Sequence, residues 1–466
     1  MFGANDKRTA RRQSASLLLA AATALTVLFT ASAAEASDTT KGFQPVRTTE
    51  RSLVFKIRGV EAKQIVAAKA LIRAKRRSKP VERQLNIARI RSVTSHNRLL
   101  TVRKPSSARG GKLLLSLSGG PESGTPPTST PSPERSSSCG WGTFSASVRP
   151  SACWRPYADS SSFNTPVAGK PVASNSAAIV SRLMGLATTP DKITTGNADT
   201  ETDWAHPIYY SQASDPLFTV DCVEAWGTCE IEGMKLRIPN QARAAGGSDG
   251  HMSVIDQAAG WEYDFWQVRS KPQGGGTISI SWGGRTRIGT ADADGLATGA
   301  TAANFGLAAG VIRPAELAAG EINHALFTVV KCTSGASVAP AAADVGRPCS
   351  SIGLSNANAP AMGQHFYLDM SVAEINALAK PAWQKTILRA MARYGTYVGD
   401  TGGSGWGLMF ESGSSYTSFG QADPWISLGD QLGATKYYDS SIDRTLRIWD
   451  FENAVDWASE LEVAAP

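Results

Sequence analysis

Residues 119–138 divide the chain more sharply than any other segment, because their sequence, GGPESGTPPTSTPSPERSSS, consists mostly of Pro, Ser, Thr and Gly. Such a segment buries too little apolar area to offset the entropy of ordering its backbone, so we expect an extended linker. All twelve Trp, all ten Tyr and all six Cys follow it. The sequence therefore predicts a small domain at 41–118 and a main domain at 139–466.

Charge separates the two predicted domains in the same way. Residues 41–120 hold 20 Lys and Arg against three acids, whereas residues 121–466 hold 23 basic and 34 acidic groups. The small basic domain is expected to contact an anionic surface such as a wall polymer, an acidic glycan or membrane lipid. No nucleic-acid partner is expected, because this domain has neither interleaved aromatic residues nor a recognisable reading motif.

The first 36 residues have the pattern of a signal peptide. Basic residues at 7–12 precede an apolar stretch at 17–29 and a cleavage site at Ala34-Glu35-Ala36. No later apolar run is long enough to cross a bilayer. We therefore expect a secreted protein without a transmembrane segment after removal of the signal.

Six cysteines in an exported protein favour disulfides over a metal site, and the sequence contains no CxxC pair. Other connectivities stay open, but pairing between sequence neighbours is the simplest. It joins Cys139 with Cys153, Cys222 with Cys229, and Cys332 with Cys349.

Short strands dominate the secondary structure predicted for the main domain. Strand-like segments separated by Gly-rich turns favour a large β-sandwich or jelly roll. They lie at 207–210, 217–223, 230–238, 251–256, 261–268, 277–282, 324–331 and 364–369. Helices are expected late, at 372–394 with a break at Pro381 and more weakly at 423–431.

The small domain is also predicted to be β-rich. Strands are expected at 51–60, 98–103 and 112–117, while 63–74 fits either a basic helix or a strand. The expected fold class is thus mainly β, with a sandwich-like main domain, a few C-terminal helices and a small basic β-rich domain in front.

The segment 249–268 is the candidate functional hairpin. Alternation along its second strand puts Glu262, Asp264 and Trp266 on one face. Residues two apart on a strand lie about 6.5–7 Å from each other, within the about 5–9.5 Å that separates the two carboxyl groups of a glycosidase. Because burying two acids is costly, we expect this face to line a groove.

The run EYDFWQ at 262–267 resembles the E-x-D-x-W-E strand motif of jelly-roll glycoside hydrolases, the laminarinase-like and cellobiohydrolase-like families. In those families the first Glu is the nucleophile and the last Glu is the acid/base. Gln267 stands at the last position here and cannot transfer a proton in that role. Another segment of the chain must then supply the carboxyl group that donates the proton, and the candidates are Asp400, Glu411, Asp249 and Glu321.

These features predict an exported polysaccharide-active enzyme, a glycoside hydrolase that uses paired carboxylates. Asp264 is the expected ionised carboxylate and Asp400 the expected proton donor, with Glu262, His251 and His324 contributing. The expected substrate-binding residues are Trp266, Trp282, Arg313, Asn323 and Glu411. No catalytic metal and no cofactor are expected, although the acidic run 292–294 leaves a structural calcium ion as an option.

Two other functions stay open. A polysaccharide lyase would use His251 or His324 to abstract a proton beside a uronate carboxylate, which Arg285, Arg287 or Arg313 would neutralise. A non-catalytic wall or glycan-binding protein would use the same acids to hydrogen-bond sugar hydroxyls. Two carboxyl groups converging in one open groove would favour the enzyme over the binding protein.

Across residues 155–430 the main domain resembles a group of uncharacterised exported bacterial proteins. FNTP at 163–166, the run 251–256, INHAL at 322–326, PAMG at 360–363 and the segment 387–400 carry the resemblance. It implies a domain boundary and no particular activity.

Overall fold

The computed structural model describes residues 39–48, 52–57, 60, 64–73, 81–96, 99–103, 110–117, 139, 141, 143–403 and 405–466. The predicted signal peptide and linker lie outside the described residues. The chain divides into two compact units between Pro127 and Thr128, within the predicted linker. Unit 1 is the chain up to Pro127, and unit 2 is the chain from Thr128 onward.

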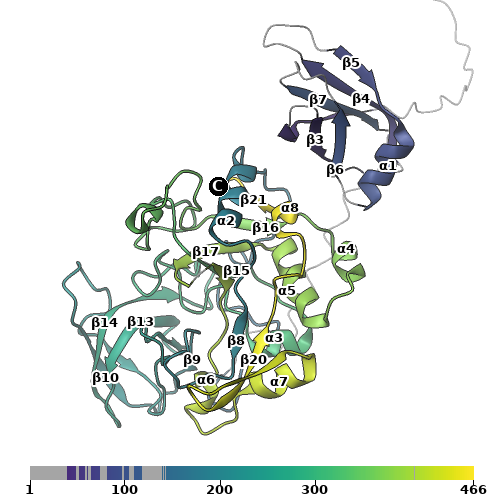
Figure 1. Ribbon diagram of the computed structural model, residues 1–466. Helices are drawn as coiled ribbons and strands as arrows, with labels where there is room; N and C mark the ends of the chain where they lie inside the picture. The colour runs from purple at the N-terminus through teal and green to yellow at the C-terminus, as the bar shows by residue number, and fades with distance from the viewer. Residues whose placement is uncertain are drawn as a thin grey trace, which may run out of the picture. The chain divides into compact units, whose positions relative to one another are not determined.

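Unit 1 consists of two small antiparallel sheets (Figure 1). One has the order β1 (Thr39–Phe43), β7 (Gly110–Leu117), β4 (Ile65–Arg73), β5 (Val81–Gln84), and the other the order β2 (Pro45–Thr48), β3 (Ser52–Lys56), β6 (Leu99–Arg103). Their apolar side chains, such as Leu53, Phe55 and Leu113, form a single core. The small domain is thus β-rich, as predicted.

Two details of unit 1 go beyond the sequence prediction. The ambiguous stretch at 63–74 is the strand β4, whose Ala68, Ala70 and Ile72 side chains alternate into the core. A helix, α1 (Ile87–His96), was not predicted, because its apolar residues are sparse among basic and polar ones. Ile90 of α1 is nevertheless buried in the same core.

The largest sheet of unit 2 has six strands and contains the predicted hairpin. Its order is β11 (Lys235–Arg237), β10 (Leu217–Cys222), β14 (Gly276–Arg287), β13 (Trp261–Ser270), β12 (Met252–Asp256), β9 (Ile208–Tyr210). Met252, Val254 and Phe265 face one hydrophobic cluster. Ile255 belongs instead to the main core. Both faces of the hairpin are therefore covered along much of its length.

A five-stranded sheet contributes side chains to the main core, among them Phe327, Phe366 and Tyr397. Its order is β18 (Trp406–Leu408), β15 (Leu326–Val330), β17 (Thr396–Thr401), β16 (His365–Leu368), β21 (Leu461–Val463). Between β16 and β17 the chain forms α4 (Val372–Ala377) and α5 (Ala382–Arg393). The predicted capping box is present, because Ser371 accepts a hydrogen bond from the Glu374 backbone N–H.

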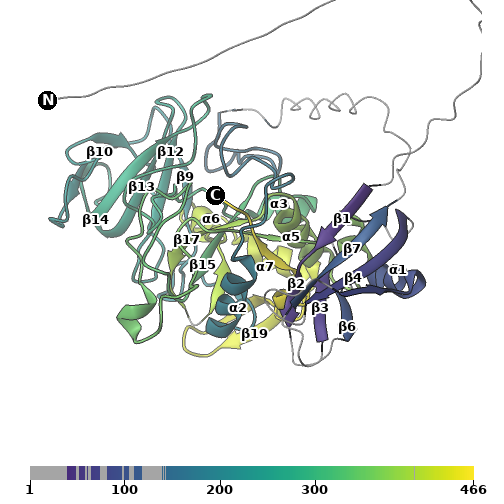
Figure 2. The same ribbon diagram turned by 90° about the horizontal axis from the view of Figure 1, so that it is seen from above.

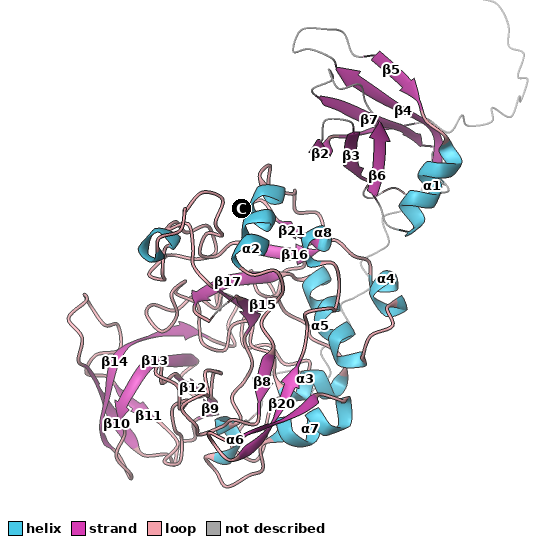
Figure 3. Cartoon of the chain, viewed as in Figure 1, coloured by secondary structure: helices cyan, strands magenta, loops and turns pink. Residues whose placement is uncertain are grey.

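The remaining elements of unit 2 are short. They are α2 (Ser176–Leu186), β8 (Ile193–Thr195), α3 (Pro314–Ala319), a 3-10 helix at Cys349–Ile352, α6 (Ser414–Thr417), α7 (Pro424–Leu432), β19 (Thr435–Asp439), β20 (Arg444–Trp449) and α8 (Trp457–Glu460). Figures 2 and 3 show α3, α5 and α7 on the side of unit 2 away from the six-stranded sheet. The mainly β fold class with C-terminal helices is confirmed.

All three predicted disulfides are present: Cys139 with Cys153, Cys222 with Cys229, and Cys332 with Cys349. Among the described residues, no helix has both the length and the apolar composition that crossing a bilayer requires.

Candidate functional site

A cleft of about 840 Å³ opens in unit 2 between the six-stranded sheet, the loop 298–304 and the end of β17. Its volume lies in the range of small-molecule and cofactor sites. The rest of the lining comes from strands β13 and β14, the loop before β12, and the segments 226–228 and 345–347. The cleft therefore brings together residues from distant parts of the sequence.

Three tryptophans form one wall of the cleft. Trp266 on β13 and Trp282 on β14 are directly opposite each other in the antiparallel register. Trp226 comes from the loop that the Cys222–Cys229 disulfide closes, and its ring centroid lies 5.4 Å from that of Trp266 and 5.9 Å from that of Trp282. Trp226 is 61% exposed, so the group presents a broad apolar surface to a ligand.

Two glycines allow the loop 298–304 to lie against this wall. A Cβ atom on Gly284 of β14 would lie 1.6 Å from the carbonyl oxygen of Thr298. Gly299 has a φ of +104°, and a Cβ atom there would lie 2.2 Å from Cδ1 of Trp282. Only residues without a side chain permit this close approach.

Asp400 reaches the cleft from the end of β17. Its Oδ1 accepts a hydrogen bond from the Thr401 backbone N–H at 2.7 Å, and its Oδ2 accepts a long one from Ala302 at 3.4 Å. Burial, with a smaller contribution from the charges of Asp249 and Asp344, raises the pKa of Asp400 to about 7, although its two backbone hydrogen bonds act in the opposite direction. Asp400 can thus hold a proton near neutral pH.

Asp249 lines the same cleft from the loop before β12 and is partly buried. Arg347 also lines the cleft, where it is exposed and donates a hydrogen bond from Nη2 to the Lys331 carbonyl oxygen at 2.9 Å. The lining therefore combines two carboxyl groups, a guanidinium group and three indoles.

The prediction that Glu262 and Asp264 line an open groove is wrong, because both side chains are 0% exposed. Glu262 accepts hydrogen bonds from the Tyr157 hydroxyl and the Ala308 backbone N–H, both at 2.8 Å. Asp264 accepts one from the Leu307 backbone N–H at 3.0 Å. The two acids hold the segment 305–308 against the sheet, and that segment covers them.

Burial raises the pKa of both carboxyl groups, and for Asp264 the charge of Glu262 raises it further. Both carboxyl groups therefore stay protonated to a higher pH than they would in water. The predicted common face of Glu262, Asp264 and Trp266 is correct, but only Trp266 extends past the covering segment into the cleft.

His251 does not line the cleft but contacts Ala300, a residue that does. Its Nε2 donates a hydrogen bond to the Ala300 carbonyl oxygen at 3.1 Å, and its ring lies 4.9 Å from that of His206. Burial lowers the pKa of His251, while the charge of Asp249 raises it. Because His251 is 5% exposed and does not line the cleft, its predicted direct catalytic role is not supported.

Arg313, His324 and Glu411 are buried in the interior and do not line the cleft. Arg313 Nη2 lies 2.6 Å and His324 Nε2 2.9 Å from Oε1 of Glu316. Glu411 Oε1 lies 3.8 Å from Arg149. Their predicted roles in substrate binding and catalysis are therefore wrong for this cleft, because their polar groups are used within the protein interior.

Four other sequence candidates also lie outside the cleft. The backbone carbonyl of Asn323 accepts from Arg155, and Glu321 is exposed elsewhere on the surface. Arg285 and Arg287 lie over the Trp261 ring, 4.2 Å and 4.0 Å from its centroid. The cleft gathers Asp400, Asp249, Trp266 and Trp282 from the sequence candidates, and it adds Trp226 and Arg347.

The described part of the chain holds no group of three or more His, Cys, Asp or Glu side chains arranged to bind a metal ion. Comparisons with protein-family models, with curated proteins and with solved structures found no match. The functional interpretation therefore depends on the chemistry of the cleft.

Proposed function

We propose that unit 2 is a polysaccharide-active enzyme that hydrolyses glycosidic bonds in the tryptophan-lined cleft. One observation carries the proposal: the cleft places the partly buried Asp400, whose pKa is raised to about 7, together with Asp249 and three indoles. Glycoside hydrolysis needs one carboxyl group that is protonated at working pH and one carboxylate.

In this proposal Asp400 gives its proton to the glycosidic oxygen while the bond from that oxygen to the anomeric carbon breaks. Asp249 acts as the ionised carboxylate. As a base, it takes a proton from the water that attacks the anomeric carbon. As a nucleophile, it bonds to that carbon until water displaces it. The anomeric form of the first product distinguishes these two courses.

The other lining residues fit a sugar polymer. Indole rings stack on the apolar faces of sugar rings, and Trp226, Trp266 and Trp282 supply such surfaces side by side. Arg347 in the lining adds a guanidinium group that suits a carboxylated sugar. The proposed substrate class is accordingly a polysaccharide with neutral or uronate residues.

We also propose that the protein is exported and that unit 1 contacts an anionic surface. Three disulfides support an oxidising compartment. Within the described residues of unit 1, Glu82 is the only acid, and it is paired with Lys69 at 3.3 Å. The other Lys and Arg side chains give unit 1 a positive net charge, which favours the binding of anionic polymers.

The test is to measure reducing ends and unsaturated uronate products after incubation of the full chain with a panel of neutral and acidic polysaccharides. Reducing ends without unsaturated products would support hydrolysis. Unsaturated products would indicate a lyase reaction and not hydrolysis. Retention of a polymer without any product would overturn the enzymatic proposal in favour of glycan binding.

A further inference from the structure

Gln267 has an unusual backbone conformation for a strand residue. Its φ is +51°, in the left-handed region, although it lies within β13. In the described part of the chain, the other non-glycine residues with positive φ are Asp or Asn, which tolerate this region better than most: Asp199, Asn304, Asn358 and Asp443. A glutamine in this conformation inside a strand must be held there by its surroundings.

The backbone around Gln267 contacts the loop before β12. The N–H of Gln267 donates to the Asp249 carbonyl oxygen at 2.8 Å, and the N–H of Val268 donates to the Gly250 carbonyl oxygen at 3.1 Å. Just beyond, the pairing of β13 with β14 shifts its register between Val268 and Ser270. Strand irregularities of this kind are common next to active sites, where they redirect the chain. Two consecutive N–H groups thus hold residues 249 and 250.

Gly250 completes this contact from the side of the loop. Its φ is +44°, and a Cβ atom there would lie 3.3 Å from both Cα of Gln267 and the backbone nitrogen of Val268. Both the conformation and the close approach favour a residue without a side chain. Two left-handed residues therefore pack against each other directly beside Asp249.

The side chain of Gln267 adds a second connection to the same loop. Its Oε1 accepts a hydrogen bond from Ser281 Oγ at 2.7 Å, and its Nε2 donates a long one to the Ser248 carbonyl oxygen at 3.4 Å. A Glu side chain has no N–H to donate to Ser248. The amide at this position therefore suits a structural role and not the proton transfer that the resembled motif assigns to Glu.

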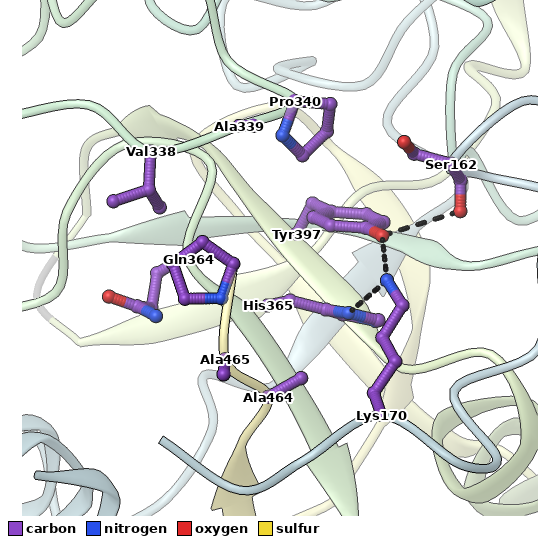
Figure 4. Close-up of a pocket in the computed structure, with 11 residues that line it drawn as sticks. Ser162, Lys170, Val338, Ala339, Pro340, Gln364, His365, Tyr397, Ala464 and Ala465 are labelled. Carbon is purple, nitrogen blue, oxygen red and sulfur yellow. Dashed lines mark hydrogen bonds between the residues drawn. The ribbon is translucent and has the colours of Figure 1, made fainter. Parts of the chain in front are cut away.

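The carboxyl group of Asp249 depends on this backbone contact for its place in the cleft. Within the part of the chain that the structure describes, its side chain makes no hydrogen bond or ion pair. A smaller pocket of about 160 Å³ in unit 2 shows the alternative (Figure 4). There Lys170 Nζ lies 3.4 Å from both His365 Nδ1 and the Tyr397 hydroxyl, so side-chain hydrogen bonds hold the lysine.

We propose that Gln267 is a positioning residue whose left-handed backbone holds Asp249 in the tryptophan-lined cleft. This inference rests on the proposed hydrolysis, in which Asp249 is the ionised carboxylate. A displacement of about 1 Å from the reacting geometry can cost about 100-fold in rate. Release of the contact should therefore lower kcat more than it changes KM.

Gly250→Ala tests the contact without changing a charge. It should lower kcat by about tenfold or more and change KM by less than about twofold. Gly274→Ala is the matched control, because Gly274 also has a positive φ, +78°, but has open space at its Cβ position and does not line the cleft. The control should lower the Tm to a similar extent and leave kcat unchanged. Equal kcat values for the two variants would overturn the proposal.

Two comparisons assign the loss to Asp249 and to the conformation of Gln267. In an Asp249→Asn background, Gly250→Ala should lower kcat no further, whereas a second tenfold loss would overturn the proposal. Gln267→Val disfavours the left-handed region and should reproduce the loss, while Gln267→Gly should retain about tenfold more of kcat than Gln267→Val. Equal losses in these two variants would contradict the role of the backbone conformation.

Hydrogen exchange of the full chain tests the contact independently of activity. The Gln267 and Val268 amides should exchange about fivefold faster, or more, in Gly250→Ala than in wild type, and at the wild-type rate in Gly274→Ala. Unchanged exchange in Gly250→Ala would overturn the proposal whatever the activity. Faster exchange together with wild-type kcat in Asp249→Asn would confirm the contact and contradict the proposed role of Asp249 in hydrolysis.

Discussion

Asp249 and Asp400 line one cleft, and the negative charge of Asp249 contributes to the raised pKa of Asp400. Asp249 precedes β12 of the six-stranded sheet, whereas Asp400 lies near the end of β17 in the five-stranded sheet. The proposed hydrolysis assigns the role of proton donor to Asp400 and that of the carboxylate to Asp249.

The pKa of Asp400 predicts the pH dependence of activity. If Asp400 must be protonated to assist the leaving oxygen, kcat/KM should fall about tenfold per pH unit well above about 7. The measurement is the initial rate of reducing-end release at low substrate concentration across a pH series. An alkaline limb that is flat or rising would contradict the role of Asp400.

The same pKa predicts a stability effect. Because the folded pKa of Asp400 is raised, the folded state keeps this proton at pH values where the unfolded chain has released it. The corresponding stability is complete below the unfolded pKa and is lost as the pH rises through about 7. Asn cannot ionise, so the Tm of Asp400→Asn relative to wild type should increase with pH over this window. A difference that stays constant with pH would contradict the raised pKa.

Trp226 should contribute to binding and not to folding. Removal of its exposed indole by Trp226→Ala should cost about 0.5–1.5 kcal/mol of ligand binding, or about two- to twelvefold in KM. The Tm should change little, because the side chain is 61% exposed. Trp204→Ala is the matched control, since Trp204 is 49% exposed and does not line the cleft. Equal effects of the two variants would contradict the stacking role.

Tyr157 should contribute to stability and not to turnover. Tyr157→Phe removes the hydroxyl that donates to Glu262, which leaves a buried carboxyl oxygen without that donor. The expected cost is about 1–3 kcal/mol in the free energy of unfolding, measured by denaturant titration. Tyr437→Phe, at a 54% exposed position, is the control. Loss of turnover in Tyr157→Phe without loss of stability would indicate that Glu262 takes part in the reaction.

Local patterns were sufficient to predict much of the fold. The alternation at 251–256 and 261–268 corresponds to β12 and β13, and the capping box at Ser371 begins α4. The three disulfides join cysteines that are neighbours in the sequence, as the sequence predicted for a chain expected to be exported. These features depend on residues that are close in sequence.

The site was only partly predictable, because its determinants are distant in sequence. Alternation placed Glu262 and Asp264 on the correct face, but it could not show that Leu307 and Ala308 would cover them. Arg347 gave no local signal. Trp226 did have a local sequence signal, because it lies inside the short Cys222–Cys229 loop, and this loop places it beside Trp266.

Turnover by Asp400→Asn is the most direct test of the proposed reaction. With a polymer that the wild-type protein cleaves, loss of the proton donor should lower kcat by at least about 100-fold. Glu321→Gln, which changes an exposed acid outside the cleft, should leave kcat unchanged. A folded Asp400→Asn variant with turnover within about twofold of wild type would contradict the account.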